Sequence, residues 1–215
     1  MVAASSCFTS ADAAFSTCGC YRWWLRRQWQ PQLPMLLFVG LNPSRADAAR
    51  DDPTLRRIVG FAGAWGFGSV LVLNLFARIG PSPAVLRRCS DPVGPENDRW
   101  LRWALGPGPT GAEVTRSLDP TAIWLGWGNQ GSWRGRDRQL LCLMQAESQQ
   151  RPVLALGLTA AGQPRHPLYA PAATGPLLLG ATHPLAQIGG PGPSCAQRAA
   201  PPWPAPPVVT PSICT

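Results

Sequence analysis

The sequence predicts an α/β protein, a three-layer α/β/α domain built on a mostly parallel, four-stranded sheet. Three observations support this prediction. The chain contains four short, unbroken apolar runs, which are typical of strands buried on both faces. Helical segments lie between these runs, as they do where crossover connections join parallel strands. Each run leads into a polar turn, and ligands of open α/β sheets bind beyond the carboxyl ends of the strands.

The four apolar runs lie at residues 35–39, 69–73, 121–125 and 153–158. We expect each of them to form a buried strand. An earlier segment, residues 20–29, is rich in aromatic residues and fits either an amphipathic helix or an edge strand. The order of the strands in the sheet does not follow from the sequence.

A helix is predicted directly after the first run. Asp51 or Asp52 would cap it and Pro53 would lie in its first turn, because both residue types are favoured there. Apolar residues then recur at spacings of three and four along residues 54–65, which predicts one buried face. The same kind of pattern predicts further helices at residues 83–88, 97–105 and 136–148.

Composition suggests a single folded domain at residues 20–171, flanked by two disordered tails. The chain has 215 residues, of which 25 are Pro and 22 are Gly. Residues 172–215 are rich in Pro, carry almost no charge and show no apolar period, so burial would not offset the entropy of ordering them. Residues 1–19 are small, polar and aperiodic, and we expect them to be disordered as well.

Charge and cysteine content limit the classes of partner. The net charge is +8, and a positive field favours anionic partners such as a nucleotide or nucleic acid. All basic residues are Arg, which binds phosphate with two parallel hydrogen bonds.

The seven Cys residues show no metal-binding spacing. No apolar run approaches the roughly 18 residues that span a bilayer, and no signal peptide is evident, so we expect a cytoplasmic protein without membrane contact. The oligomeric state stays open.

Several common chemistries are set aside because their motifs are missing. The chain has no dinucleotide fingerprint, no Lys for a phosphate-binding loop of the Walker type, and no Gly-x-Ser-x-Gly element. It has two His residues, so a His-rich metal site is excluded, and we expect no cofactor. Asp51 and Asp52, with Glu96 and Asp98, remain open as a carboxylate cluster for a divalent ion, as a general base, or as helix caps and solvated turns.

Polar side chains follow the four predicted strands. They are, in chain order, Asn42, Asn74, Trp127 with Asn129, and Arg165 with His166. The carboxyl ends of parallel strands lie at one edge of the sheet, so these side chains can converge on a polar, planar ligand. The prolines on either side of His166 fix its backbone, and its imidazole could donate to an oxygen that gains negative charge.

At these residues the chain resembles a bacterial and phage family, domain of unknown function sixteen-forty-three, over residues 20–171. The resemblance is carried by Gly40-Leu-Asn-Pro-Ser44, Asp51-Asp-Pro-Thr-Leu-Arg-Arg57, Trp65-Gly-Phe-Gly68, Asn74-Leu-Phe-Ala77, Asp91-Pro-Val-Gly-Pro-Glu-Asn-Asp98, Trp127-Gly-Asn129 and Gly157-Leu-Thr-Ala-Ala-Gly-Gln-Pro-Arg-His-Pro-Leu-Tyr169. Family members tend to have Thr at the position of Arg45 and Lys near Ala160. The family itself implies no activity.

The layout is also similar to that of the uracil-DNA glycosylase superfamily. That similarity implies that Asn42 orients an attacking water, Asn74 reads the edge of a base and His166 stabilises the departing base. Leu168 would then lie near the side chain that enters the duplex when a base is flipped out. The chain departs from that pattern at Ser44, where those enzymes have a second Gly, and in the loop at residues 45–54.

Three hypotheses from different classes follow. The first is a glycosylase-like hydrolase acting on a nucleobase in nucleic acid or in a nucleotide, with Asn42 and His166 as catalytic residues. Its substrate-binding residues would be Ser44, Asn74, Trp127, Asn129, Arg165, Leu168 and Tyr169.

The second hypothesis is a binding module for nucleotides or single-stranded nucleic acid that has no catalytic activity. Aromatic side chains would stack on bases while guanidinium groups meet phosphates; these residues are Trp127, Trp133 and Tyr169, with Arg134, Arg136, Arg138 and Arg165. The third is a metal-dependent small-molecule enzyme that uses Asp51, Asp52 and Glu96.

Overall fold

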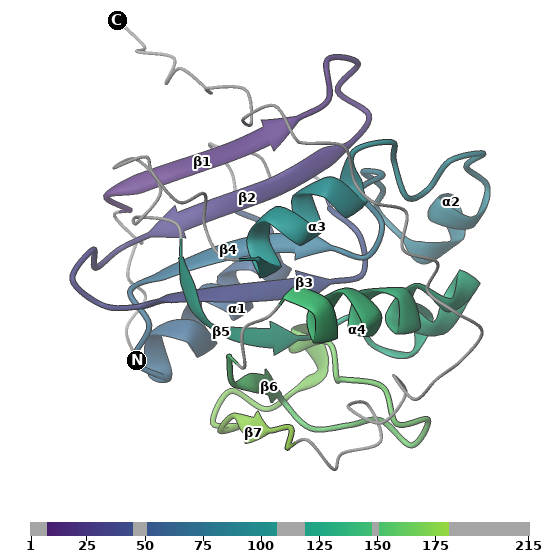
Figure 1. Ribbon diagram of the computed structural model, residues 1–215. Coiled ribbons are helices and arrows are strands. Elements are labelled where there is room, and N and C mark those ends of the chain that lie inside the picture. Colours follow the sequence, from purple (N-terminus) through teal and green to yellow (C-terminus); the bar gives the residue numbers. More distant parts are fainter. Residues whose placement is uncertain (1–7, 45–50, 107–118, 148–150, 181–215) are drawn as a thin grey trace, which may run out of the picture.

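The computed structural model describes residues 8–44, 51–106, 119–147 and 151–180. Within these residues the strands form one sheet in the order β1-β2-β4-β3-β5-β6-β7 (Figure 1). The strands are β1 (Ser10–Phe15), β2 (Arg22–Gln28), β3 (Met35–Gly40), β4 (Ser69–Asn74), β5 (Pro120–Leu125), β6 (Val153–Ala155) and β7 (Leu177–Leu178). The helices are α1 (Pro53–Ala64), α2 (Pro83–Arg87), α3 (Asn97–Leu105) and α4 (Arg136–Glu147), with the 3₁₀ turns η2 (Asn129–Gly135) and η3 (Pro167–Tyr169).

The four apolar runs form the parallel centre of the sheet. β3 pairs in parallel with β4 on one side and with β5 on the other, and β6 continues the parallel set beyond β5. Every residue of β3 and β4 is buried, because helices cover both faces, which is why the runs show no polar alternation. The α/β class predicted from the sequence is therefore confirmed.

The prediction of a four-stranded, mostly parallel sheet is wrong in its extent. The described part of the chain adds three antiparallel strands, β1 and β2 at one side and β7 at the other, so the sheet is mixed and seven-stranded. Residues 20–29 form a strand, but it is not at the edge, since β1 pairs along its outer side. Both β1 and β7 lie in the segments for which composition suggests disorder.

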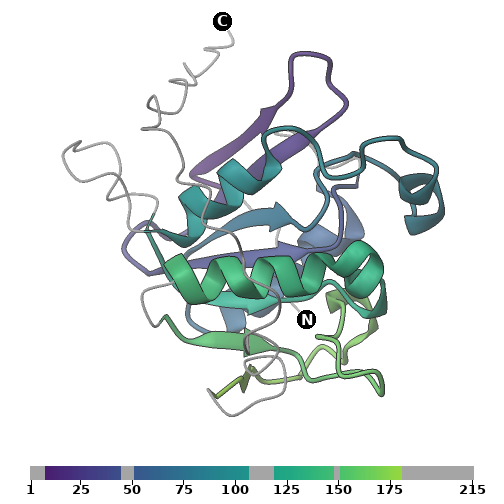
Figure 2. The same ribbon diagram turned by 45° about the vertical axis from the view of Figure 1, so that its right-hand side comes forward.

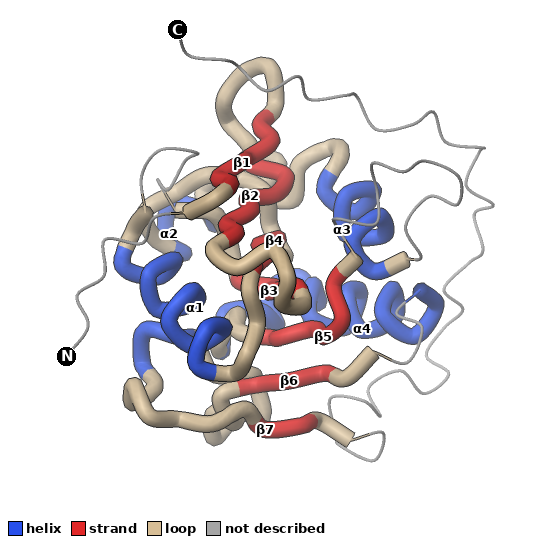
Figure 3. The backbone as a smooth tube through the Cα atoms, turned by 90° about the vertical axis from the view of Figure 1, so that its left-hand side faces the viewer, coloured by secondary structure: helices blue, strands red, loops and turns tan. Residues whose placement is uncertain are grey.

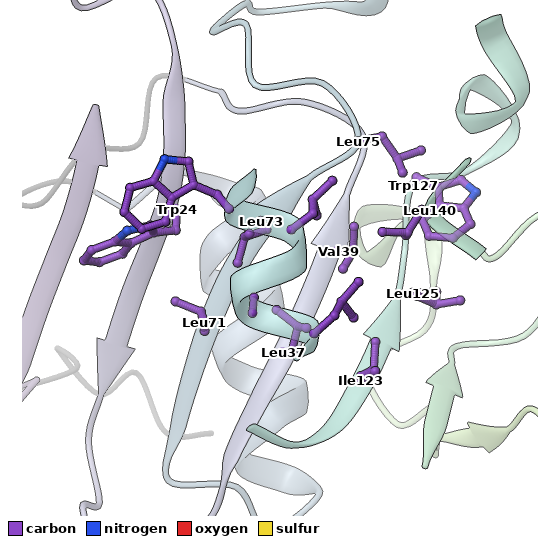
Figure 4. Packing of buried hydrophobic residues seen from close by; sticks show 14 of the residues in the cluster. Trp24, Leu37, Val39, Leu71, Leu73, Leu75, Ile123, Leu125, Trp127 and Leu140 are labelled. Carbon is purple, nitrogen blue, oxygen red and sulfur yellow. The ribbon is translucent and has the colours of Figure 1, made fainter. Parts of the chain in front are cut away.

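Helices lie on both sides of the sheet, as the three-layer prediction requires. Figure 3 shows α1 on one side of the strands and α3 with α4 on the other. Side chains of α1 pack with alternate residues of the central strands, including Phe38 and Trp124. The other residues of those strands, such as Leu37 and Leu71, pack with α3 and α4 (Figure 4). Figure 2 shows the ribbon from a second direction. The two apolar clusters hold the layers together.

Helix α1 begins where the sequence predicts it. The Asp52 side chain accepts a hydrogen bond of 2.7 Å from the Leu55 backbone N–H, and Pro53 occupies the first turn. Both are favoured at a helix start, since the first N–H groups have no partner within the helix and Pro has no N–H to leave unpaired. This cap fixes the position of Asp52 at the end of the sheet that carries the polar turns.

None of the helices that the structure describes is long and apolar enough to cross a bilayer.

Candidate functional site

The strand order creates a switch point at β3. The connections from β3 and β5 lead to opposite faces of the sheet, so the chain diverges beyond their carboxyl ends and leaves a crevice there. Two adjoining cavities occupy this region, an inner one of about 60 Å³ and an outer one of about 640 Å³. They share Asn42, Ser44 and His166, so the polar turns do meet at one edge of the sheet.

The inner cavity brings together five residues that the sequence singles out: Asn42, Ser44, Asp52, Asn74 and His166. Its polar lining consists of Arg22, Asn42, Ser44, Asp52, Thr54, Asn74 and His166, and its apolar lining includes Phe38, Leu55, Ile58 and Val72. The outer cavity is lined by Trp127, Asn129, Arg165, Leu168 and Tyr169, together with the loop at residues 80–83. Every residue that the first hypothesis names as catalytic or substrate-binding therefore lines one of the two cavities. Four residues that the second hypothesis adds line neither cavity: Trp133, Arg134, Arg136 and Arg138.

Asn74 ends β4 and presents an unpaired hydrogen-bond donor. Its side chain is 4% exposed, and its Nδ2 has no hydrogen-bond partner among the described residues. A buried amide without a partner costs free energy, roughly 1–3 kcal/mol, so it marks a place where a ligand can supply the missing acceptor. A β-carbon at Gly40 on the neighbouring strand would lie 3.0 Å from the Asn74 Oδ1, so a larger residue there would press on this amide.

Asn42 is held by its amide nitrogen. Its Nδ2 donates to the backbone carbonyls of Pro43, at 3.1 Å, and of Gly80, at 3.0 Å. These two bonds tie the turn after β3 to the loop after β4 and fix the orientation of the carboxamide. The Asn42 Oδ1 accepts no hydrogen bond from the described residues, so it remains able to accept one from a ligand or a water.

His166 is set up as a neutral hydrogen-bond donor. Its Nδ1 accepts a hydrogen bond of 3.3 Å from the Leu168 backbone N–H, so in the neutral ring the proton is on Nε2. Burial lowers the pKa of His166 from its usual 6.5, while the negative charge of Asp52 acts in the opposite direction. Near neutral pH the ring is therefore uncharged and offers an N–H to the cavity.

Ser44 and Asp52 form a hydrogen-bonded pair in the inner cavity. The Ser44 hydroxyl donates to the Asp52 Oδ2, while the Asp52 Oδ1 caps helix α1. Arg22, on β2, also lines this cavity and is 4% exposed. Burial lowers the pKa of Arg22 to about 10, with Asp52 opposing that shift, so its guanidinium is charged near neutral pH. A buried positive charge therefore faces the cavity beside a carboxylate.

Comparison with protein families supports the resemblance seen in the sequence. The model of the family described as "Protein of unknown function (DUF1643)" matches residues 22–168. The chain belongs to this family. A search of curated proteins returned no match, and neither did a search of solved structures.

The part of the chain that matches the DUF1643 family contains almost the whole site. It begins at Arg22 and ends at Leu168, so Tyr169 is the one lining residue of the two cavities that falls outside it. Sequence reasoning missed Arg22, because the segment 20–29 did not distinguish a helix from a strand. The signal that could have identified Arg22 is its position at the start of a run of Trp and Leu residues. A charged residue in a buried strand needs a partner or a function.

Trp127 has a different environment from the one expected of a ligand-binding residue. Its side chain is 1% exposed and belongs to the core that packs against α4 (Figure 4). Its Nε1 donates to Gln163 at 2.7 Å, and Gln163 donates in turn to Asp137 at 2.9 Å. This buried network leaves no indole face for stacking on a base. Trp127 therefore forms part of the wall of the outer cavity but does not offer its ring face to a ligand.

The rim of the outer cavity carries the other residues that the sequence predicts to bind a substrate. Asn129 accepts a hydrogen bond of 2.5 Å from the Thr159 hydroxyl, and the Nε of exposed Arg165 donates to the Leu158 carbonyl at 3.0 Å. Tyr169 is 80% exposed beside Leu168, so both side chains are accessible to a ligand. These contacts position the rim without using up its exposed apolar surface.

The acidic residues do not gather into a metal site within the described ranges. Each of three carboxylates pairs with a different arginine: Asp51 with Arg27, Glu96 with Arg99, and Asp98 with Arg136. No group of three or more His, Cys, Asp or Glu side chains that could hold an ion occurs in the described part of the chain. Arg136 is itself buried and bound to Asp98 and the Leu75 carbonyl, so it is not a surface contact for phosphate.

Proposed function

We propose that the protein is an N-glycosylase-type hydrolase that cleaves the bond between a nucleobase and its sugar, in nucleic acid or in a nucleotide. The observation that carries the proposal is the buried, unpaired Nδ2 of Asn74 in a cavity shared with Asn42 and His166. A planar base with an exocyclic oxygen supplies the acceptor that this amide lacks. Phe38 in the wall of the same cavity offers the apolar contact that a flat ring needs.

The three polar side chains take separate roles in the proposed reaction. Asn74 donates to an oxygen on the base and selects it. Asn42 Oδ1 accepts a hydrogen bond from the attacking water and orients it. His166 donates through Nε2 to an oxygen of the base, where negative charge builds up as the bond to the sugar breaks. A neutral donor suits this role, because it stabilises the charge without having to lose its proton first.

A base-release assay tests the proposal. Oligonucleotides, nucleosides and nucleotides containing uracil, hypoxanthine or a damaged base are incubated with the protein, and the free base is separated and quantified. We expect release from at least one of these substrates, lowered about 100-fold or more by His166→Ala, because removing one oxyanion donor typically costs this much. Arg102→Ala, an exposed change on α3 away from both cavities, is the control and retains the wild-type rate. Absence of release from every substrate, or equal rates for wild type and His166→Ala, contradicts the proposal.

A second candidate uses the same cavities for binding without cleavage. The exposed Tyr169 favours it, since an accessible aromatic ring beside Arg165 is a typical platform for stacking a base of a single strand. In that case the protein binds single-stranded nucleic acid or a nucleotide with an affinity that falls as salt rises, and no base is released. Tyr169→Ala would then weaken binding by about 1–3 kcal/mol. The two candidates differ in turnover, which the base-release assay measures directly.

A further inference from the structure

The proposed hydrolysis requires a group that takes a proton from water, and most of the inner cavity is unsuited to this task. The carboxamide of Asn42 is not basic, and its nitrogen already donates to two backbone carbonyls. His166 uses its Nδ1 lone pair to accept from Leu168, and burial further lowers the pKa of the ring. These residues can orient a water and donate to a leaving group, but they cannot receive the proton.

Asp52 is the one carboxylate among the described residues that line the inner cavity. Its two oxygens are held by independent contacts, Oδ1 by the Leu55 backbone N–H and Oδ2 by the Ser44 hydroxyl. Each carboxylate oxygen has two lone pairs, so each can still accept a proton or a further hydrogen bond. The helix cap and the serine therefore hold a proton acceptor in a fixed position, which is what general base catalysis needs.

The charges around Asp52 favour this role. The charged or titratable groups that line the cavity with it are Arg22, on β2, and His166, on the turn before η3. Asp52 lies close enough to Arg22 for the two charges to interact, and its carboxylate caps the N-terminus of α1. Once Asp52 has taken a proton it is neutral, and Arg22 and His166 then face the negative charge that has moved to the base.

We infer that Asp52 is the general base of the inner cavity, with Ser44 as the residue that positions its carboxylate. This inference rests on the proposed function. One O–H bond of water breaks and its proton goes to Asp52, while the water oxygen forms a bond to the anomeric carbon of the sugar. The bond from that carbon to the base nitrogen breaks, and its electron pair leaves with the base. Asp52 then returns the proton to the departing base or to solvent, so that the products are the free base and the sugar hemiacetal.

Asp52→Asn separates the chemical role of this residue from its structural one. Asn is as good a helix cap as Asp, so the bond to Leu55 and the fold are retained, but the amide cannot accept the proton. Asp119→Asn is the matched control, because Asp119 is an exposed carboxylate that lines neither cavity. Ser44→Ala removes the hydroxyl that holds Oδ2 and leaves the base itself in place.

The test measures kcat and KM for base release with the substrate that the wild-type protein cleaves. We expect Asp52→Asn to lower kcat at least 100-fold and to leave KM within about threefold. Ser44→Ala lowers kcat about tenfold with KM likewise within about threefold, and Asp119→Asn behaves as wild type. A wild-type protein that releases no base overturns the proposed function and this inference together. If the wild-type protein releases base and the Asp52→Asn variant does so with a similar kcat, the inference alone is overturned.

Discussion

Two buried asparagines at the end of β4 and the start of α3 use their side chains in opposite ways. Asn97 donates to the backbone carbonyls of Asn74 and Leu75, at 3.1 and 3.0 Å, and so joins α3 to the sheet. Asn74 has no partner for its Nδ2 in the described part of the chain. The same residue type therefore serves the fold at one position and remains available for a ligand at the other, and substitution can tell the two apart.

Replacing each asparagine by alanine is expected to have opposite effects on stability and binding. Asn97→Ala removes two buried hydrogen bonds, although Arg136 still donates to the Leu75 carbonyl, so we expect the free energy of unfolding to fall by about 1–3 kcal/mol. Asn74→Ala removes a group that has no bond to lose, so we expect less than about 1 kcal/mol. Denaturation with urea measures both. Asn74→Ala should instead lower kcat/KM for base release by about 10-fold to 100-fold. A larger loss of stability in Asn74→Ala than in Asn97→Ala contradicts this assignment.

The buried ring of His166 makes stability depend on pH. Burial lowers its pKa in the folded protein, so between the unfolded value of 6.5 and the lower folded value the unfolded chain binds a proton that the native chain does not. The stability that comes from the neutral ring is complete above pH 6.5 and is lost as the pH falls through the folded pKa. We expect the free energy of unfolding to fall more steeply between pH 7 and pH 5 in wild type than in His166→Gln, which urea denaturation at each pH measures. Equal slopes for the two proteins would show that the ring titrates alike in both states.

At the scale of elements, α1 supports both walls of the inner cavity. Its first turn fixes Asp52 through the cap. One turn further along, the Arg57 guanidinium donates to the backbone carbonyls of Pro167, the first residue of η3, and of Ala170, which follows η3. It also lies 4.8 Å from the ring of Phe61. The turn that carries His166 is therefore held by the same helix that positions the carboxylate. The spacing between Asp52 and His166 depends on this one element.

Substitution of Arg57 should loosen η3. We expect Arg57→Ala to lower the free energy of unfolding by about 2 kcal/mol, since hydrogen bonds from a charged donor contribute about 1.5–3 kcal/mol. Backbone amides of residues 166–170 should also exchange faster with deuterium, which mass spectrometry of peptides resolves. Arg56→Ala is the control, because Arg56 is exposed and donates to the carbonyl of Asp51 alone, so it should cost less than about 0.5 kcal/mol. Similar exchange at η3 in both variants would exclude the positioning role of Arg57.

The elements that the sequence predicts are those whose signals are local. An unbroken apolar run marks β3, and the cap at Asp52 with Pro53 marks the start of α1 to within a residue. β1 gives no such signal, because its Ser-Ala-Asp-Ala-Ala-Phe sequence has little intrinsic strand preference and forms through pairing with β2. The sequence did not identify Arg22 as a site residue, because its place in the inner cavity depends on which strand β2 pairs with. That contact is non-local.

At the scale of the molecule, the site lies where the parallel centre of the sheet meets its antiparallel flank. The parallel strands supply the turns with Asn42, Asn74 and His166, and their placement follows from the strand ends alone. β2 runs antiparallel to β4, so its first residue, Arg22, reaches the same edge of the sheet from the opposite chain direction. The positive charge of the inner cavity therefore comes from the part of the fold that the parallel pattern does not predict.

This arrangement makes the site depend on β1, a strand outside the segment that matches the family. β1 covers the outer side of β2 from Ser10 to Phe15 and buries Ala14 in the core.

A protein that lacks residues 1–16 exposes the hydrogen-bonding groups of β2 as a new sheet edge, which favours pairing between copies. We expect its Tm to fall by roughly 5–10 °C, because a loss of 1 kcal/mol shifts Tm by about 2–4 °C in a chain of this size. Light scattering should show self-association that rises with concentration, and base release should fall as Arg22 loses its fixed position. A protein that begins at Phe8 keeps β1 and serves as the control; equal Tm values and equal masses for the two truncated proteins would show that β2 holds its place without β1.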